Sequence, residues 1–207
     1  MQSRGWIGIL TVYMARSKEF NEDVVLDKAV DLFWHKGFNG ISAQEIVDGL
    51  GLSRSSLYDT YGDKRTLFVR ALKRYRITET GSIVAMLDNA KDVKKVITAI
   101  FQASGSECLG QKSGMGCFIV NSGIELAPHD PEIAEIIREG REALENGFSR
   151  ALQRAQESGQ ISTRQSAKAF ASFLVNNLWG LKTYGKAGSK NEIILDTIRI
   201  TLSVLEP

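Results

Sequence analysis

The stretch SAQEIVDGLGLSRSSLYDTYGDK, residues 42–64, decides the fold. Ser42 and Glu45 have the spacing of a capping box, in which the serine hydroxyl accepts from a free backbone amide and the glutamate reaches back, so a short helix begins there. Two glycines interrupt this helix, and Ser53 has the chemistry of an N-cap for a second helix that continues to Tyr61. Two short helices separated by a glycine turn predict a helix-turn-helix.

The helices on either side of this stretch follow from apolar spacing and end signals. Upstream, apolar side chains recur at positions i, i+4, i+7 and i+8, which predicts a helix from about Asn21 to Lys36. Downstream, Asp63 is placed to cap a longer helix that runs from Lys64 to beyond Tyr75. The sequence therefore predicts three helices followed by a long fourth one.

Beyond residue 77 the sequence predicts a second, larger helical body. Asp130 followed by Pro131 gives the clearest helix start, because aspartate caps free backbone amides and the first helical position makes no use of the N–H that proline lacks. Ser162 and Ser189 each begin a capping-box pattern for one of the last two helices. The helices predicted here cover about 92–108, 117–126, 131–159, 162–186 and 189–205.

The composition of the 207 residues favours a packed, all-α protein. Hydrophobic residues make up 43% and charged residues 24%, which suits one or two globular domains and excludes a wholly disordered chain. No proline, the residue that most often breaks a helix, precedes Pro128. Two cysteines, Cys108 and Cys117, without CxxC spacing do not make a secreted disulfide scaffold or a zinc motif, so the sequence fits a reducing cytoplasm.

Residues 1–20 need separate treatment because they contain a short apolar run that begins after Arg4. The run is too short to span a membrane and leads to no convincing signal-peptide cleavage site. Two interpretations stay open: a flexible N-terminal arm, or an extension upstream of a true start at Met14. We divide the rest into a helix-turn-helix domain, residues 21–68, and a second helical domain, residues 69–207, in which no segment is long and apolar enough to span a membrane.

The formal net charge is only +2, but the charges are unevenly distributed. Between Glu19 and Leu50 seven acids face two lysines, whereas between Ser53 and Arg76 seven cations face two acids. The position of this basic run directly behind a helix-turn-helix favours a polyanionic partner such as DNA, and a solvated helix face is the alternative.

Three segments of the N-terminal domain share one pattern. They are Ala29…Phe33…Lys36-Gly37-Phe38, Ser42…Ile46…Leu50-Gly51-Leu52-Ser53 and Ser56-Leu57-Tyr58…Tyr61-Gly62-Asp63-Lys64…Leu67-Phe68. Over about residues 24–68 the chain thus resembles the DNA-binding domain of the TetR/AcrR family of bacterial transcriptional regulators. Residues 116–131 also resemble a ligand-domain segment of one AcrR-like branch. Val47 and Tyr61 depart mildly from the family, which often has Ala and Phe there, and both stay apolar.

The resemblance implies that the second helix of the motif enters the major groove of double-stranded operator DNA. Arg54 has the geometry to bind guanine O6 and N7 with two hydrogen bonds, and Ser55 and Ser56 contact bases or phosphates. The family's phosphate contacts fall at Tyr58, Tyr61 and Lys64, with Ser42 and Thr60 as weaker candidates. Packing in the domain core is the alternative for both tyrosines, and for Tyr61 it is favoured.

The last two predicted helices carry more apolar surface than one stripe needs. A helix that is apolar on several sides is usually buried on several sides, which predicts a homodimer whose last two helices pair with their symmetry mates as a four-helix bundle. A central core helix is the alternative.

The second domain also contains candidate residues for an effector pocket. They are mostly aromatic with some amides, which suits a moderately apolar organic molecule, and ordinary core or dimer packing is the alternative for each residue. The set is Phe101, Phe118, Asn121, Phe173, Asn176, Asn177, Trp179 and Tyr184.

The resulting prediction is a homodimeric, cytoplasmic transcriptional repressor that a small organic molecule releases from its operator, without cofactor, metal or membrane. A small all-helical transferase and a helical adaptor are the alternatives. No catalytic motif supports the first: the two histidines, His35 and His129, lie far apart, and no nucleotide-binding or hydrolase motif is present. The two cysteines are candidate sensors of oxidants or electrophiles, Cys117 above Cys108, because Cys117 lies at the start of a predicted helix, where free amides favour the thiolate. The alternative is that both are small buried apolar residues.

Overall fold

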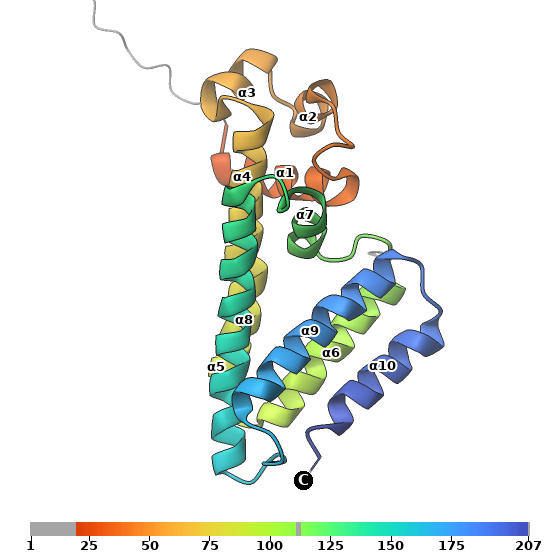
Figure 1. Ribbon diagram of the computed structural model, residues 1–207. Coiled ribbons are helices and arrows are strands. Elements are labelled where there is room, and N and C mark those ends of the chain that lie inside the picture. Colours follow the sequence, from red (N-terminus) through yellow and green to blue (C-terminus); the bar gives the residue numbers. More distant parts are fainter. Residues whose placement is uncertain (1–19, 111–112, 207) are drawn as a thin grey trace, which may run out of the picture.

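The computed structural model describes residues 20–110 and 113–206, and within these ranges every regular element is a helix (Figure 1). Residues 1–19, most of the segment predicted as an arm or extension, lie outside the described residues. The elements are α1 (Glu22–Lys36), α2 (Ala43–Leu50), α3 (Arg54–Tyr61), α4 (Lys64–Tyr75), η1 (Arg76–Thr80, a π-helix), α5 (Gly81–Asp88), α6 (Val93–Leu109), α7 (Phe118–Leu126), α8 (Pro131–Glu157), α9 (Ala167–Lys186) and α10 (Asn191–Ser203).

The caps predicted around the helix-turn-helix are confirmed. Ser42 and Glu45 form the complete capping box of α2, and Ser53 and Asp63 accept from backbone amides at the starts of α3 and α4. The turn between α2 and α3 contains Gly51 in the left-handed conformation, φ +68°, which costs glycine little. A Cβ on Gly49 would lie 2.8 Å from the side chain of Leu32, so glycine there lets α1 and α2 approach closely.

The first core joins α1–α4 to the beginning of the second body. Phe68 of α4 packs edge to face against Phe33 of α1, at 5.0 Å between ring centroids, and against Phe118 of α7, at 5.5 Å. Ile133 and Ile136 of α8 are buried in the same cluster. The helices α1–α4 therefore pack directly against α7 and α8 through shared apolar side chains rather than being joined to them by a loose linker.

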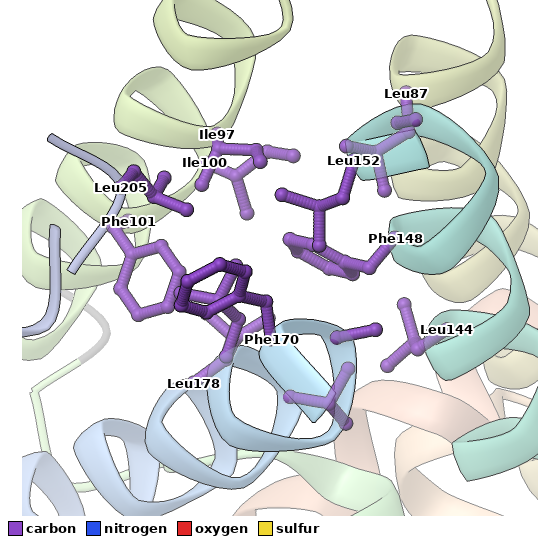
Figure 2. Packing of buried hydrophobic residues seen from close by; sticks show 14 of the residues in the cluster. Leu87, Ile97, Ile100, Phe101, Leu144, Phe148, Leu152, Phe170, Leu178 and Leu205 are labelled. Atoms are coloured by element: carbon purple, nitrogen blue, oxygen red, sulfur yellow. The ribbon is translucent and has the colours of Figure 1, made fainter. Parts of the chain in front are cut away.

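The second core lies between α5, α6, α8, α9 and α10. Figure 2 shows Phe101, Phe148 and Phe170, from three different helices, directed toward a common interior. The start of α8 agrees with the prediction, because Asp130 caps it and Pro131 is its first residue. Figure 1 shows α2 and α3 at one end of the molecule and the C-terminus at the other.

Two predicted helix starts are wrong. The helix predicted from Ser162 begins at Ala167 with Ser166 as its cap, because Ser162 is buried, accepts from the amide of Arg164 and donates its own amide to Leu205. The last helix begins at Asn191 rather than at Ser189, and no side chain caps it. The helix predicted to pass Tyr75 continues through η1 into α5. No helix in the described ranges is long and apolar enough to cross a membrane.

Candidate nucleic-acid interface and ligand cavity

The helix α3 presents its polar side outward. Leu57 and Tyr61, four residues apart, are 5% and 2% exposed and hold the helix against the domain core. Arg54, Ser55 and Asp59 are exposed on the other side. Since α3 lies at the end of the molecule farthest from the C-terminus (Figure 1), this polar side faces away from the body.

Among the cations between Ser53 and Arg76, Arg54 is the best placed to reach an external partner. It is the first residue of α3, is exposed, and its guanidinium lies 5.8 Å from the centroid of the Tyr58 ring. Within the described residues no acid pairs with it. The hydroxyls of Ser55 and Ser56 lie 3.0 and 2.8 Å from that of Ser53, the N-cap, so they form a small cluster beside Arg54.

The structure corrects the set of predicted DNA contacts at Tyr61. Its ring is buried in the domain core under the guanidinium of Arg70, and its hydroxyl, also buried, has no hydrogen-bond partner in the described chain. Burial of the hydroxyl also raises the pKa of Tyr61. The packing alternative therefore accounts for this residue, while Tyr58 and Thr60 remain partly exposed.

Two further predicted contacts have structural partners inside the domain. The ammonium of Lys64 donates to the carbonyl of Ile41 at 2.5 Å and lies 4.6 Å from the centroid of the Phe38 ring, so it ties α4 to the segment before α2. The hydroxyl of Ser42 donates to the Glu45 carboxylate at 2.7 Å and accepts from the amide of Glu45. Both residues stabilise the domain whatever else they contact.

The predicted basic patch is mostly neutralised. Five of the seven cations between Ser53 and Arg76 pair with acids of α1, α8 or the turn before α8. The pairs are Arg65 with Asp130 and Glu132, Arg70 with Glu22, Lys73 with Glu132, Arg74 with Asp23 and Asp27, and Arg76 with Glu139. Most cations of this run therefore lie on a solvated helix face, the alternative to a DNA-binding surface, where their ion pairs hold α4 and η1 to neighbouring helices.

Polar contacts also fix the helix-turn-helix to α7 and α8. The Glu125 carboxylate at the end of α7 accepts from the amides of Phe38 and Asn39 at 3.1 and 2.8 Å. Arg65 donates two hydrogen bonds to Asp130, at 2.7 and 2.8 Å, and this pairing lowers the pKa of the Asp130 carboxyl. Movement of α7 or of the start of α8 would therefore be transmitted to the helix-turn-helix.

The second body contains a cavity of about 270 Å³ between η1, α5, α6, α7 and α9. Apolar side chains line most of it, and the polar groups at its wall include Thr80, Ser104, the ion pair of Glu107 with Lys182, and the exposed Glu79 and Ser82. These polar residues were absent from the predicted pocket. Ser104 and Glu107 lie three residues apart on α6, and the fold brings Thr80 of η1 and Lys182 of α9 to them.

The structure does not bring the eight predicted pocket residues together. Trp179 lines the cavity and Phe101 is a core residue, whereas Phe118, although buried, and Asn121 both line an open hollow between α1, α7 and α9. Phe173, Asn176 and Tyr184 lie on the exposed side of α9, and the amide of Asn177 donates to the Phe173 carbonyl. These residues were predicted from their aromatic and amide side chains. Helical phase, however, places those of α9 on different sides of that helix.

The two cysteines have different surroundings, and both are free thiols. Cys108 is buried, its thiol donates to the Leu181 carbonyl at 3.6 Å, and burial raises the pKa of the thiol. Cys117 occupies the N-cap position of α7 without a side-chain cap bond, lines the cavity, and accepts from the Tyr75 hydroxyl at 3.8 Å. Within the described residues no group of three or more His, Cys, Asp or Glu side chains is arranged to hold a metal ion.

Comparison with known proteins places this geometry among regulators. Residues 25–71 match the family model described as bacterial regulatory proteins, tetR family, and residues 77–198 match that of the tetracyclin repressor-like, C-terminal domain. The uncharacterized HTH-type transcriptional regulator YezE of Bacillus subtilis (strain 168) is 34% identical over 194 residues, 93% of this chain and 100% of YezE. The HTH-type transcriptional repressor ComR of Escherichia coli (strain K12) is 27% identical over 188 residues, 90% of each chain.

A solved structure gives the same fold. It is a cysteine mutant of the TetR family transcriptional regulator CifR complexed with 26-bp double-strand operator DNA. It superimposes with a TM-score of 0.79 at 21% identity, covering 92% of this chain and 100% of the CifR chain. At this identity the likeness concerns the fold alone.

Proposed function

Since the chain belongs to the TetR family of bacterial regulatory proteins and is a transcriptional regulator with a helix-turn-helix DNA-binding domain, we propose that it is a homodimeric repressor released from operator DNA by a small organic molecule. The family and the relatives are regulators and not enzymes, which removes the transferase alternative. We assign operator binding to residues 21–68 and effector binding and dimerisation to residues 69–207, and we place the protein in the cytoplasm.

The exposed start of α3 carries the operator-binding part of this proposal. Arg54 is exposed there without an acid partner among the described residues, while most other cations nearby are paired. An unpaired guanidinium at the N-terminal end of a recognition helix has the charge and the donor geometry to bind a guanine edge in the major groove. Backbone phosphates would be contacted by Tyr58, Thr60 and Ser42, which fix register without reading sequence.

The exposed side of α9 supports a dimer. Ala169, Phe173, Asn176, Gly180 and Tyr184 recur at helical spacing along one face, and Phe173 and Tyr184 are 42% and 58% exposed. Large apolar side chains of α10 are exposed as well, Ile193 and Ile200 among them. Two helices with unpartnered apolar faces fit a four-helix bundle formed with a second copy.

Release by an effector needs a link between the cavity and α3. Tyr75 at the end of α4 and Cys117 at the start of α7 line the cavity, and α7 holds the helix-turn-helix through Glu125. A molecule in the cavity weakens operator binding only if it binds the DNA-incompetent arrangement more tightly, because equal affinity for both arrangements shifts no population. One relative, ComR, is a transcriptional repressor, which supports repression rather than activation.

Selection from a random duplex library tests the proposed function. We expect the purified protein to enrich a near-palindromic site with half-sites about one helical turn apart, roughly 34–36 Å, or a multiple of that spacing. Failure to enrich any site would contradict operator binding.

A pair of glycine variants tests the dimer. A Cβ added at Gly180 or Gly81 would meet no atom within 4 Å, and both positions are exposed, so both Gly180→Arg and Gly81→Arg should fold. We expect Gly180→Arg, which adds a charge to the exposed face of α9, to be monomeric by light scattering and to lose operator binding. The matched Gly81→Arg variant on α5 should remain dimeric. Two dimeric variants would contradict an interface through α9.

A further inference from the structure

We propose that the cavity selects uncharged or cationic organic molecules over carboxylates, and that Thr80 and Ser104 bind the polar head group of the molecule. This inference rests on the proposed function, because it names the chemical class of the effector. The observations that carry it are the hydroxyls of two buried residues, which have no partners, and the balance of charges at the cavity wall.

The hydroxyls of Thr80 and Ser104 are available to a ligand. Both residues are 6% exposed and both line the cavity, one from η1 and the other from α6. Within the described chain neither side chain has a hydrogen-bond partner. Neither oxygen is among the fully buried side-chain atoms without a partner, so both hydroxyls keep accessible surface in the cavity, where a bound molecule can form a hydrogen bond with them.

Neighbouring residues of the same kind behave differently. Thr78 in η1 donates to the Arg74 carbonyl at 3.1 Å, and Thr98 in α6 donates to the Lys94 carbonyl at 2.8 Å. Helical serines and threonines can make this bond to a carbonyl four residues earlier. Neither Thr78 nor Thr98 lines the cavity. Of the threonines in these two segments, only Thr80, which lines the cavity, lacks this bond. Ser106 of α6 lacks it as well, but it is exposed to solvent outside the cavity.

The π-helix explains how Thr80 reaches the cavity. A turn of π-helix contains an extra residue, so side chains after it are rotated relative to a continuous α-helix. The turn Arg76–Thr80 lies between α4, whose Tyr75 also lines the cavity, and α5, which supplies Ile83. Such turns occur frequently at functional sites.

The charges at the wall disfavour an anion. Lys182 is the only cation among the lining residues, and it already pairs with Glu107. Glu79, at an exposed position of the wall, adds a carboxylate for which no ion pair is found in the described chain. A bound carboxylate would be desolvated beside two acids and one committed lysine, whereas an amine gains an attractive carboxylate and an alcohol requires no counter-charge.

The apolar part of the wall fits a compact hydrocarbon body. Ile83, Ile100, Leu144, Leu178 and Trp179 come from four helices, and Figure 2 shows Ile100, Leu144 and Leu178 directed into the interior of the second body. A cavity of about 270 Å³ accommodates one or two rings but not a long acyl chain in extended form.

Matched probe triplets test the inference on the full-length dimer. Each triplet keeps one apolar body, benzyl, cinnamyl or 2-naphthylmethyl, and changes the head group among alcohol, primary amine and carboxylate. We expect calorimetric titration to show alcohols or amines binding at least about tenfold more tightly than the carboxylate with the same body. Equal or tighter binding of the carboxylates, or no binding by any alcohol or amine, overturns the inference.

Variants test the role of the two hydroxyls. Losing one neutral hydrogen bond weakens binding about fivefold, so we expect Thr80→Val combined with Ser104→Ala to weaken the best alcohol roughly 25-fold. Thr98→Val, on α6 but outside the cavity, should leave its affinity unchanged. Without ligand the double variant should melt close to wild type, because neither hydroxyl makes a hydrogen bond within the described chain. Unchanged alcohol binding by the double variant overturns the assignment.

Operator binding measured on the same samples separates this inference from the proposed function. A protein that binds its selected operator but none of the nine probes overturns the inference and leaves the regulator intact. Head-group selection without any operator binding overturns the proposed function instead, and supports the cavity assignment.

Discussion

Arg54→Ala will weaken operator binding far more than Arg70→Ala, although both remove one arginine from the same basic run. Arg54 is exposed at the start of α3 without an acid partner in the described chain, whereas Arg70 pairs with Glu22 at 3.5 Å and covers the Tyr61 ring. One bidentate arginine–guanine contact discriminates against other bases by about 1–3 kcal/mol, so Arg54→Ala should cost roughly that amount in each half-site. Exposed ion pairs contribute about 0–1 kcal/mol to stability, so Arg70→Ala should fold and bind nearly as wild type does.

The assay is fluorescence anisotropy with the selected operator, a version with changed guanines and a random duplex, each at several salt concentrations. Arg54→Ala should bind the operator and the guanine-changed duplex alike. Each phosphate-neutralising cation contributes about 0.9 to the slope of log K against log salt concentration, so Arg70→Ala should leave the slope unchanged. Equal losses for the two variants on the operator, or a reduced slope for Arg70→Ala, would refute the assignment of the basic run to internal pairing.

Three further predictions follow from packing and charge. Gly185→Ala should destabilise the protein by about 1–3 kcal/mol in urea unfolding because its Cβ would lie 2.4 Å from the Cys108 sulfur, while Gly81→Ala should stabilise it by roughly 0.5–1 kcal/mol. The ion pair with Lys36 and the cap bonds with Ser42 lower the pKa of Glu45 from 4.5 to about 2. The Glu45 carboxylate should therefore contribute fully to stability above pH 4.5, and this contribution should be lost as the pH falls through about 2. Glu45→Gln should show a smaller loss of unfolding free energy over that range. Iodoacetamide should modify Cys117 before Cys108, whose pKa burial raises, and peptide mapping that finds the reverse order would contradict this.

Local signals in the sequence predicted the helix starts whose caps act within a few residues. The capping box at Ser42 and the caps at Asp63 and Asp130 formed as predicted, since each satisfies amides no more than three residues away. The same kind of signal failed at Ser162, whose amide bonds to Leu205, more than forty residues along the chain. A cap is therefore predictable only where no distant group competes for its backbone.

The cavity lay beyond prediction for a related reason. The aromatic residues of α9 were predicted to line the pocket, yet helical phase places Trp179 at the cavity and Phe173 and Tyr184 on the exposed side of the helix. Thr80 reaches the cavity wall after a turn of π-helix, which no pattern of apolar spacing indicates. The residues that set the polarity of a site are thus chosen by packing between helices.

The basic run shows why a local charge excess is a weak indicator of a DNA-binding surface. The acids that neutralise it lie 47 to 67 residues away along the chain at Arg74–Asp27 and Arg65–Glu132, so the excess in the sequence disappears when α1 and α8 pack against α4. Arg54 escapes this pairing because α3 stands at the end of the molecule, where α8 does not reach it (Figure 1). Specific binding must then depend on few cations that face DNA, and affinity should respond strongly to the base that Arg54 meets and only weakly to the total charge of the run.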